Sequence, residues 1–472
     1  MPRYFVTLIV AVALFMEQMD STVIATSLPA IAHDLGEDPI ALKLAMTSYL
    51  LSLAVFIPIS GWMADRFGAR TVFRAAIVVF TLGSTACGFA HSLPDFVLFR
   101  IVQGMGGAMM VPVGRLVILR TVPKAELISA LAWLTIPALL GPVIGPPLGG
   151  FITTYIAWQW IFWINIPVGL LGIVLATRFI GDFRETDLAP LDVKGFILSG
   201  IGLAGLAFGF TTIGQDLLPQ WLALTLFGLG GIFCFLYVRH ARDNPTALID
   251  LGLLKIETFY ASVVGGFLYR IGIGAMPFLL PLLFQIGFGM NPFQSGMLTF
   301  AGAVGAITMK TTAAPILRRF GFRRVLLVNV FISCLFIAAA SLFQPSTPQT
   351  LILAVLLAGG FFRSLQFTSI NVLAYADIEP AALSRATSFA SVAQQLSLSA
   401  GVAIGAMVLE LERYWRETTS VDMGDFALAF IVVASIAASS AFIFARLPKN
   451  AGANLAGNAR SLGVGESPAP QA

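Results

Sequence analysis

The chain has 472 residues, of which 57% are hydrophobic and only 11% charged, and its formal net charge is +4 at pH 7. Globular domains average about 45–50% apolar and about 25% charged residues, so a soluble core cannot account for this composition. The surplus apolar side chains are expected to face lipid. The basic excess does not indicate a nucleic-acid surface, because Lys and Arg of a membrane protein concentrate in its cytoplasmic loops.

The cysteines and histidines do not form a recognisable chemical site. Each of the three cysteines lies inside an apolar run without metal-ligand spacing, and the three histidines are scattered among loops. An enzyme would need a convergent nucleophile, metal or cofactor site. We therefore expect no enzymatic activity, no metal and no cofactor.

Fourteen runs of about 18 or more mostly apolar residues predict membrane-spanning helices. In chain order, their cores lie near residues 5–28, 43–63, 73–90, 95–119, 128–152, 160–180, 193–213, 219–238, 258–284, 293–313, 324–343, 350–373, 387–409 and 427–446. Glu17 and Asp20 interrupt the first run and no small-residue cleavage pattern follows it, so we expect a span and not a signal peptide. Twelve spans is the alternative count.

Basic residues favour one side of these spans. With the N-terminus in the cytoplasm, about twenty lysines and arginines fall in cytoplasmic segments, against Lys43, Arg413 and Arg416 outside. The positive-inside rule demands this asymmetry. We predict a protein integral to a bacterial cytoplasmic membrane, with both termini cytoplasmic.

Two ordered sequence matches indicate an internal repeat. RFGAR at residues 66–70 recurs as RFGFR at 319–323, and FRIVQ at 99–103 recurs as FRSLQ at 362–366, with offsets of 253 and 263 residues. Both RFGxR loops lie on the same predicted side of the membrane. The repeat is therefore parallel, as in transporters that consist of two six-helix halves.

The repeat divides the chain into four parts. We predict a six-helix bundle over residues 1–190, two inserted transmembrane helices over 191–250, a second six-helix bundle over 251–448 and a disordered cytoplasmic tail over 449–472. The tail is rich in Gly, Ala, Ser and Pro, which disfavour a packed fold. The predicted fold class is an all-α membrane protein.

Five motifs resemble those of the major facilitator superfamily and, within it, the fourteen-span drug/proton antiporters. They are GWMADRFGAR (61–70), RIVQGMGGA (100–108), GPVIGPPLGG (141–150), DSTVIATSLP (20–29) and NIPVG (165–169). The first is highly specific. The resemblance covers the chain to about residue 446. It implies a major facilitator fold of two six-helix bundles plus two inserted helices, and export driven by a proton gradient.

By this resemblance, two motifs take part in the conformational change of transport. The 61–70 loop is a cytoplasmic latch that stabilises the outward-facing state, through Gly61, Asp65, Arg66, Gly68 and Arg70. The fifth span is a gating helix, through Gly141, Pro142, Gly145, Pro146, Gly149 and Gly150. Glycines every four residues let a partner helix approach, and prolines remove backbone donors. The alternative for the loop is a topology anchor without a moving part. The alternative for the fifth span is ordinary bundle packing.

Ionisable residues at membrane depth cost roughly 2.5–3.5 kcal/mol each and so indicate function. They are Glu17, Asp20, Arg100, Arg270 and Arg363, on four helices that, by the resemblance, line the central cavity. Asp20 and Arg100 are expected at one level of the membrane and can pair. Glu17 and Asp20 share a helix face, so their like charges favour one protonated carboxyl. We predict that Asp20, Glu17 and Arg100 couple transport to protons, with Asp20 as the principal carrier; a fixed salt bridge is the alternative.

Polar groups on the same helices form the predicted substrate cavity. Its residues are Gln103, Tyr269, Arg270, Arg363, Gln366 and Asn371. In a chain with 39 phenylalanines, such a surface suits bulky amphipathic molecules. Two acids against three arginines give anionic or zwitterionic substrates the same weight as cationic ones.

Together these features predict a proton-coupled antiporter that exports small amphipathic compounds, of the multidrug efflux type, by alternating access. A dedicated exporter of one metabolite is the alternative, and a channel or a transport-dead sensor on the same fold is a further one. The expected partners are a small-molecule substrate and the lipid bilayer, without nucleic acid. An accessory periplasmic protein enters by analogy only, and we expect the monomer to be functional.

Overall fold

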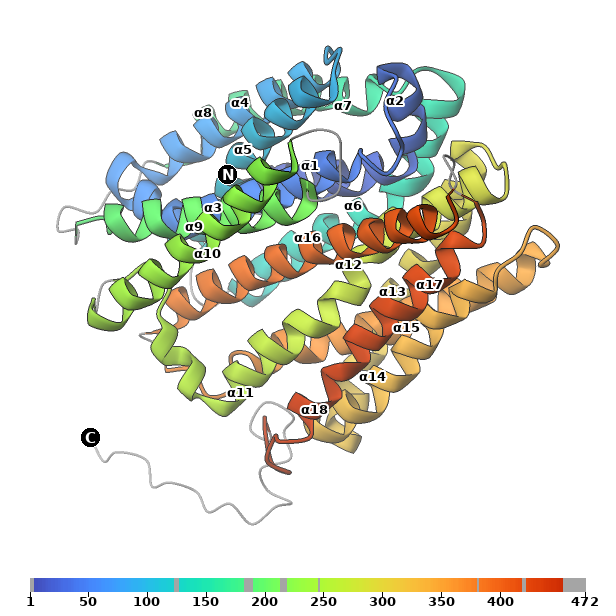
Figure 1. Ribbon diagram of the computed structural model, residues 1–472. Coiled ribbons are helices and arrows are strands. Elements are labelled where there is room, and N and C mark those ends of the chain that lie inside the picture. The colour runs from blue at the N-terminus through green and yellow to red at the C-terminus, as the bar shows by residue number, and fades with distance from the viewer. Residues whose placement is uncertain are drawn as a thin grey trace.

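A computed structural model describes residues 4–122, 127–181, 190–212, 219–244, 247–379, 382–417 and 422–452, with the backbone alone at 4–5, 127–139 and 243. Every regular element in these ranges is a helix, which confirms the all-α fold class (Figure 1). The predicted tail falls largely outside the described residues.

Thirteen helices are long and apolar enough to cross a membrane. A further helix of 29 residues, α6, contains no charged residue. Each of the fourteen predicted runs coincides with one of these helices, in the order α1 (Tyr4–Val23), α3 (Lys43–Phe67), α4 (Ala69–Cys87), α5 (Leu93–Thr121), α6 (Leu127–Tyr155), α7 with α8 (Trp160–Trp163, Asn165–Phe179), α9 (Val193–Thr212), α10 (Gln220–Asp243), α11 with α12 (Glu257–Tyr260, Gly266–Leu282), α13 (Pro292–Phe320), α14 (Phe322–Ala339), α15 (Gln349–Leu373), α16 (Leu383–Trp415) and α17 with α18 (Asp425–Ser439, Ala441–Phe444).

Local sequence explains where several of these helices begin and end. The side chain of Ser92 accepts a hydrogen bond from the Asp95 amide and starts α5. Asn291 and Gln294 form a capping box at the start of α13. The first span is extended beyond α1 by a short 3-10 turn and by α2 (Leu28–Leu35), which ends at Gly36 in the left-handed conformation.

The two RFGxR loops have the same backbone conformation. Gly68 separates α3 from α4 with φ +94°, and Gly321 separates α13 from α14 with φ +73°. Only glycine adopts such angles at little cost. The two turns therefore agree with the predicted repeat. We call the membrane side that carries them the basic face, after the arginines that flank them, and the other side, near α2, the opposite face.

The inserted helices α9 and α10 lie between the two halves in Figure 1. They pack closely on each other, because Gly205 and Gly230 leave no room for a side chain between their backbones. Their outer surfaces reach both halves, since Tyr237 of α10 joins an apolar cluster with Ala54 of α3 and Val392 of α16.

The halves meet mainly along two helix pairs, α6 with α13 and α3 with α16. At the α6–α13 contact, a Cβ on Gly150 would collide with the backbone of Pro292 and Phe293, and one on Gly296 with the backbone of Pro146. These glycines lie toward the opposite face, where α6 ends and α13 begins. The two halves are therefore in closest contact at the opposite face.

Within the second half, α13 and α15 are also packed through glycine. A Cβ on Gly360 would fall on the Gly302 carbonyl oxygen, whereas one on Gly228 of α10 would meet nothing within 4 Å. We expect Gly360→Ala to lower the free energy of unfolding by about 1–3 kcal/mol relative to Gly228→Ala. Thermal unfolding of the two purified variants in detergent checks this, and equal melting temperatures would contradict it.

Candidate functional site

Asp20 lies at the centre of a fully buried polar cluster between α1, α5 and α8. Its Oδ2 accepts a hydrogen bond from Arg100 at 2.7 Å, and its Oδ1 accepts from Gln103 at 2.8 Å and from Asn165 at 3.0 Å. Asp20 is 0% exposed and Arg100 1% exposed. The carboxylate thus has one cationic and two amide donors, which offset the cost of burying its charge.

The Arg100 guanidinium is held on several sides. Besides Asp20, it donates to the Gln103 side chain at 2.6 Å and, from Nε, to the Ala45 carbonyl at 3.2 Å. Its Cζ lies 4.3 Å from the centre of the Tyr49 ring. Gln103 therefore belongs to the Asp20 cluster. The predicted pairing of Asp20 with Arg100 is present in the structure.

Glu17 lies one helical turn from Asp20 in a different environment. It is 3% exposed. One carboxylate oxygen accepts from the Gln18 side chain at 2.6 Å and the other from the Tyr49 hydroxyl at 3.3 Å. No Lys, Arg or His is within ion-pair distance among the described residues. A buried carboxyl without a cation is held at least cost as the neutral acid.

Sequence reasoning did not assign two members of the Asp20 cluster. Asn165 donates to both Asp20 and the Ser84 hydroxyl, and Ser84 donates to the Phe162 carbonyl. Asn165 opens the NIPVG motif, so the signal was an amide two residues before a proline within an apolar run. Ser84 gave no signal, because serines are common in the apolar spans of this chain.

The second half places its predicted cavity residues differently. Tyr269 and Gln366 are 0% exposed and contact α14, where Tyr269 bonds with Ser333 and Gln366 with Asn329 and the Leu326 carbonyl. Their burial away from free surface gives them a packing role in this state. A contact between either residue and substrate stays a prediction.

Arg270, Asn371 and Arg363 lie on the α12 and α15 side of the second half. Arg270 donates to the Asn371 side-chain oxygen at 2.7 Å. Arg363 lies beside Gly302 of α13. Neither arginine has an ion pair with a carboxylate among the described residues.

The predicted gating helix α6 packs its glycine face on α1. A Cβ on Gly141 would meet the backbone of Gln18 and Met19, one on Gly145 the Thr22 side chain, and one on Gly149 the carbonyl of Val23. Pro142 and Pro146 lie within the same helix and supply no backbone donor. The helix that carries Glu17 and Asp20 thus touches α6 directly, and α6 in turn touches the other half through Gly150.

Four hydrogen bonds or ion pairs between described residues cross from one half to the other, and all lie at the opposite face. Lys43 pairs with Glu410 at 3.0 Å, and Arg413 pairs with Asp38. The Gln285 side chain donates to the Thr26 carbonyl at 2.9 Å. The Phe293 amide donates to the Thr154 hydroxyl at 3.1 Å. Lys43 is the first residue of α3, where the predicted span begins, and is only 1% exposed.

The predicted latch contacts its own half in this state. Asp65 at the end of α3 pairs with Arg120 at the end of α5, at 2.8 Å. Arg66 is exposed, Arg70 is partly exposed, and a Cβ on Gly61 would meet nothing within 4 Å. Gly61 therefore faces open space here.

The matches to known proteins agree with this arrangement. Residues 10–239 and 262–466 match the model of the Major Facilitator Superfamily. The chain belongs to the major facilitator superfamily. It is 38% identical over 453 residues to "Putative multidrug resistance protein MdtD" of Salmonella heidelberg and of Salmonella typhimurium, with 95% of each chain covered. The family expected from the motifs is confirmed.

Solved structures of transporters share the superfamily fold. The crystal structure of a D-xylose–proton symporter matches with a TM-score of 0.68 at 15% identity, covering 95% of this chain and 99% of that one. A bacterial homologue of the human lysosomal transporter Spinster matches with a TM-score of 0.59 at 16% identity, with 97% of each chain covered. The family match and the thirteen apolar helices of membrane-spanning length show an integral membrane protein of a transporter superfamily.

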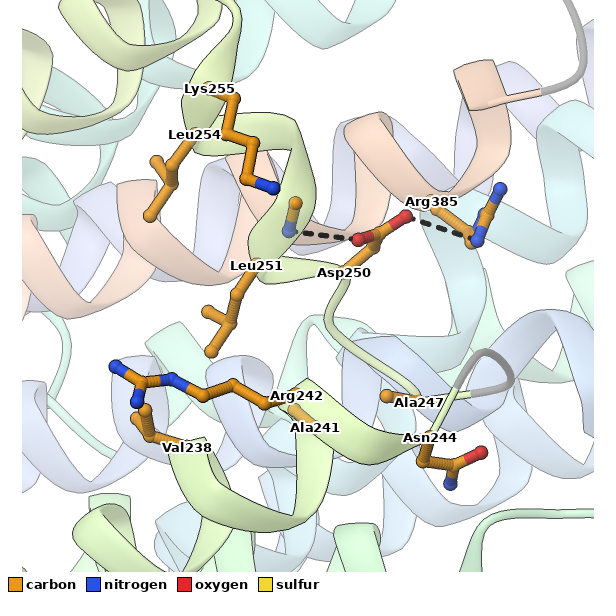
Figure 2. A pocket seen from close by; sticks show the side chains of 11 residues that line it. Val238, Ala241, Arg242, Asn244, Ala247, Asp250, Leu251, Leu254, Lys255 and Arg385 are labelled. Carbon is orange, nitrogen blue, oxygen red and sulfur yellow. Dashed lines mark hydrogen bonds and ion pairs between the residues drawn. The ribbon is translucent and has the colours of Figure 1, made fainter.

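A separate cleft of about 790 Å³ opens at the basic face of this superfamily member. Figure 2 shows Asp250 on its wall, bound to the Gly252 amide and to Arg385 at the start of α16. Arg242 of α10 and Lys255 also line the cleft. It lies where the inserted pair rejoins the second half, and none of its lining residues belongs to the Asp20 cluster.

The buried pair makes a prediction about stability. Arg100→Gln leaves the Asp20 carboxylate without its cation, and we expect a loss of about 3–5 kcal/mol in the free energy of unfolding. The double variant Asp20→Asn/Arg100→Gln removes both charges and should recover much of that loss. Thermal unfolding of both variants in detergent measures this, and an Arg100→Gln protein as stable as the double variant would contradict it.

Proposed function

We propose that this protein is a proton-coupled antiporter that exports small amphipathic compounds by alternating access. The observation that carries the proposal is the contrast between two carboxyl groups on α1. Asp20 is paired with Arg100, whereas Glu17 is buried beside it without a cation among the described residues. A carboxyl in such a site can gain or lose a proton when its surroundings change, which is the property that coupling requires.

This contrast favours Glu17 over Asp20 as the proton carrier. The negative charge of the Asp20 carboxylate is already balanced by Arg100 in this structure. Protonation of Asp20 would weaken the three hydrogen bonds that its carboxylate accepts. Glu17 accepts hydrogen bonds only from the buried Tyr49 hydroxyl and from Gln18, which is partly exposed. In this proposal Asp20 and Arg100 position α1, and Glu17 carries the proton.

The direction of transport follows from orientation. The positive-inside rule assigns the basic face to the cytoplasm, with both termini there, in the bacterial inner membrane. The halves are then sealed toward the outside by the contacts at the opposite face. In this inward-facing state, substrate would enter from the cytoplasm, while Glu17 would release its proton to the same side.

Export requires the alternate state, in which the basic face closes. The open space beside Gly61 leaves room for the start of α16 to approach α3 there. Asp65 would then exchange part of its bonding to Arg120 for the N-terminal amides of a helix from the other half. The four cross-half contacts at the opposite face would have to break in the same movement.

The chemical range of the substrates rests on resemblance. The relatives at 38% identity carry a multidrug resistance name, which supports several unrelated substrates. A dedicated exporter of one metabolite would show no competition among unrelated compounds. A channel or a transport-dead sensor would give no uphill movement under any proton gradient. We propose a monomer that acts in the lipid bilayer without a cofactor; an accessory periplasmic protein is not needed by the mechanism.

The coupling residue is tested in proteoliposomes with an imposed pH gradient and a panel of cationic, neutral and anionic amphiphiles. Glu17→Gln is nearly isosteric but cannot titrate, so uphill export should fall to the background level while downhill exchange of substrate survives. In detergent, substrate addition should release protons from the unmodified protein and not from Glu17→Gln, as followed with a pH indicator dye.

Asp20→Asn is the matched control for this test. It should lower stability by leaving Arg100 unpaired, yet the folded fraction should still release protons on substrate addition. Proton release that is lost in Asp20→Asn and kept in Glu17→Gln would return the carrier role to Asp20. Normal export by both variants would make the acidic pair purely structural.

The latch makes a separate prediction. Asp65→Asn keeps the side-chain shape but removes the charge that pairs with Arg120 and that a helix N-terminus would bind. We expect an export rate reduced by about tenfold with normal amounts of folded protein in the membrane, because each kilocalorie lost from the closed state shifts its population several-fold. Export assays in proteoliposomes with matched protein amounts measure this, and full activity would reduce the loop to a topology anchor.

A further inference from the structure

The internal repeat places one arginine at the same position of each half, but their surroundings differ. Arg100 of α5 is neutralised by Asp20 at 2.7 Å. Arg363 of α15 is the equivalent residue of the second half by the FRxxQ match. It has no carboxylate partner among the described residues. The second half therefore keeps a charge at membrane depth that the first half cancels.

The position of Arg363 indicates which medium it meets. It is partly exposed and lies ten residues before the end of α15, roughly 15 Å from the basic face. A guanidinium that faced lipid at this depth would be costly. Its terminal nitrogen lies beside Gly302 of α13, the helix that also contacts α6 of the other half. The exposed part of Arg363 is therefore expected to face the interior of the bundle and not lipid.

A second uncompensated arginine lies next to the same face of α15. Arg270 is 3% exposed, and its only hydrogen bond in the described structure goes to Asn371 at 2.7 Å. Its Nε is buried and has no hydrogen-bond partner. Its Cζ lies 5.5 Å from the centre of the Phe367 ring. Such an arginine retains donors for a ligand.

Spacing brings these groups onto one strip of α15. Arg363, Phe367 and Asn371 recur every four residues and so lie along one helix face. A third cation, Lys310 of α13, reaches the neighbouring turn, where its Nζ donates to the Thr368 hydroxyl at 2.7 Å. Lys310 is exposed. The strip combines an aromatic ring with three cations from three helices, none of them paired with a carboxylate in the described chain.

We propose that Arg363, Arg270 and Lys310 form a binding site for the anionic group of the exported compound, with Phe367 against its apolar part. The substrates would then be amphipathic organic anions that carry a carboxylate or a group of similar chemistry. Arginine donates to such groups in a fixed fork, and a ligand charge would compensate these cations, which have no carboxylate partner among the described residues. This inference rests on the proposed export function and specifies its substrate class.

A pair of probes that differ only in charge tests the site. Dansyl-phenylalanine ends in a carboxylate, and dansyl-phenylalaninamide is its neutral counterpart. We expect the purified full-length protein in detergent to bind the carboxylate at least tenfold more tightly than the amide, as measured by dansyl fluorescence. Arg363→Gln and Arg270→Gln should each weaken binding of the carboxylate by tenfold or more and leave binding of the amide within about twofold.

Two further variants separate binding from folding. Arg363→Lys keeps the charge and should retain part of the preference for the carboxylate. Arg446→Gln removes an exposed arginine at the basic face and should bind both probes like the unmodified protein. Arg363→Gln should also melt at or above the temperature of the empty unmodified protein, because it removes a charge with no partner. Equal binding of the two probes by the unmodified protein would overturn the proposal.

Transport distinguishes this inference from the function on which it rests. In proteoliposomes with a pH gradient, export of dansyl-phenylalanine that Arg363→Gln abolishes would support both. Export of cationic or neutral amphiphiles alone, unaffected by Arg363→Gln, would overturn the anion site and leave proton-coupled export intact. Absence of export for every probe, together with tight carboxylate binding, would overturn the export function and keep the anion site.

Discussion

The cost of placing a charge inside a membrane organises this structure. Asp20 and Arg100 are tolerated at depth because each cancels the other and because Gln103, Asn165 and the Ala45 carbonyl use their remaining hydrogen-bonding capacity. The cluster joins α1, α3, α5 and α8, so the first half is held together by a polar centre inside an apolar bundle. Glu17 differs from this pair, because no cation in the described part of the chain pairs with its carboxyl.

Glycine brings the helices around the acidic pair into close contact. Three glycines of α6 bring it against α1, and a fourth brings it against α13 of the other half. The acidic pair is therefore one helix away from the seam between the halves. In the proposed mechanism, a change of charge on α1 would reach that seam through these close helix contacts. The proline content of α6 adds to this by removing hydrogen bonds that would stiffen it.

The sequence predicted the helices well because lipid demands long apolar runs, and the turns at Gly68 and Gly321 because positive φ requires glycine. The level of Asp20 and Arg100 followed from helical rise. Partners on helices from different halves could not be predicted: Lys43 and Glu410 are 367 residues apart, and nothing local relates them. Tyr269 and Gln366 were assigned to the cavity by their polarity, but polarity does not reveal which neighbouring helix a side chain faces.

The inserted pair has a consequence for hydrophobic molecules dissolved in the bilayer. A two-half transporter has two lateral seams, which repeat symmetry makes alike. Here α9 and α10 lie against the α3–α16 seam and are joined to both of its helices through the cluster around Tyr237. These two helices cover the α3–α16 seam with a second layer of protein, and they do not cover the α6–α13 seam. The molecule thus has a shielded flank and a less shielded one, and entry from the lipid is no longer equivalent on its two sides.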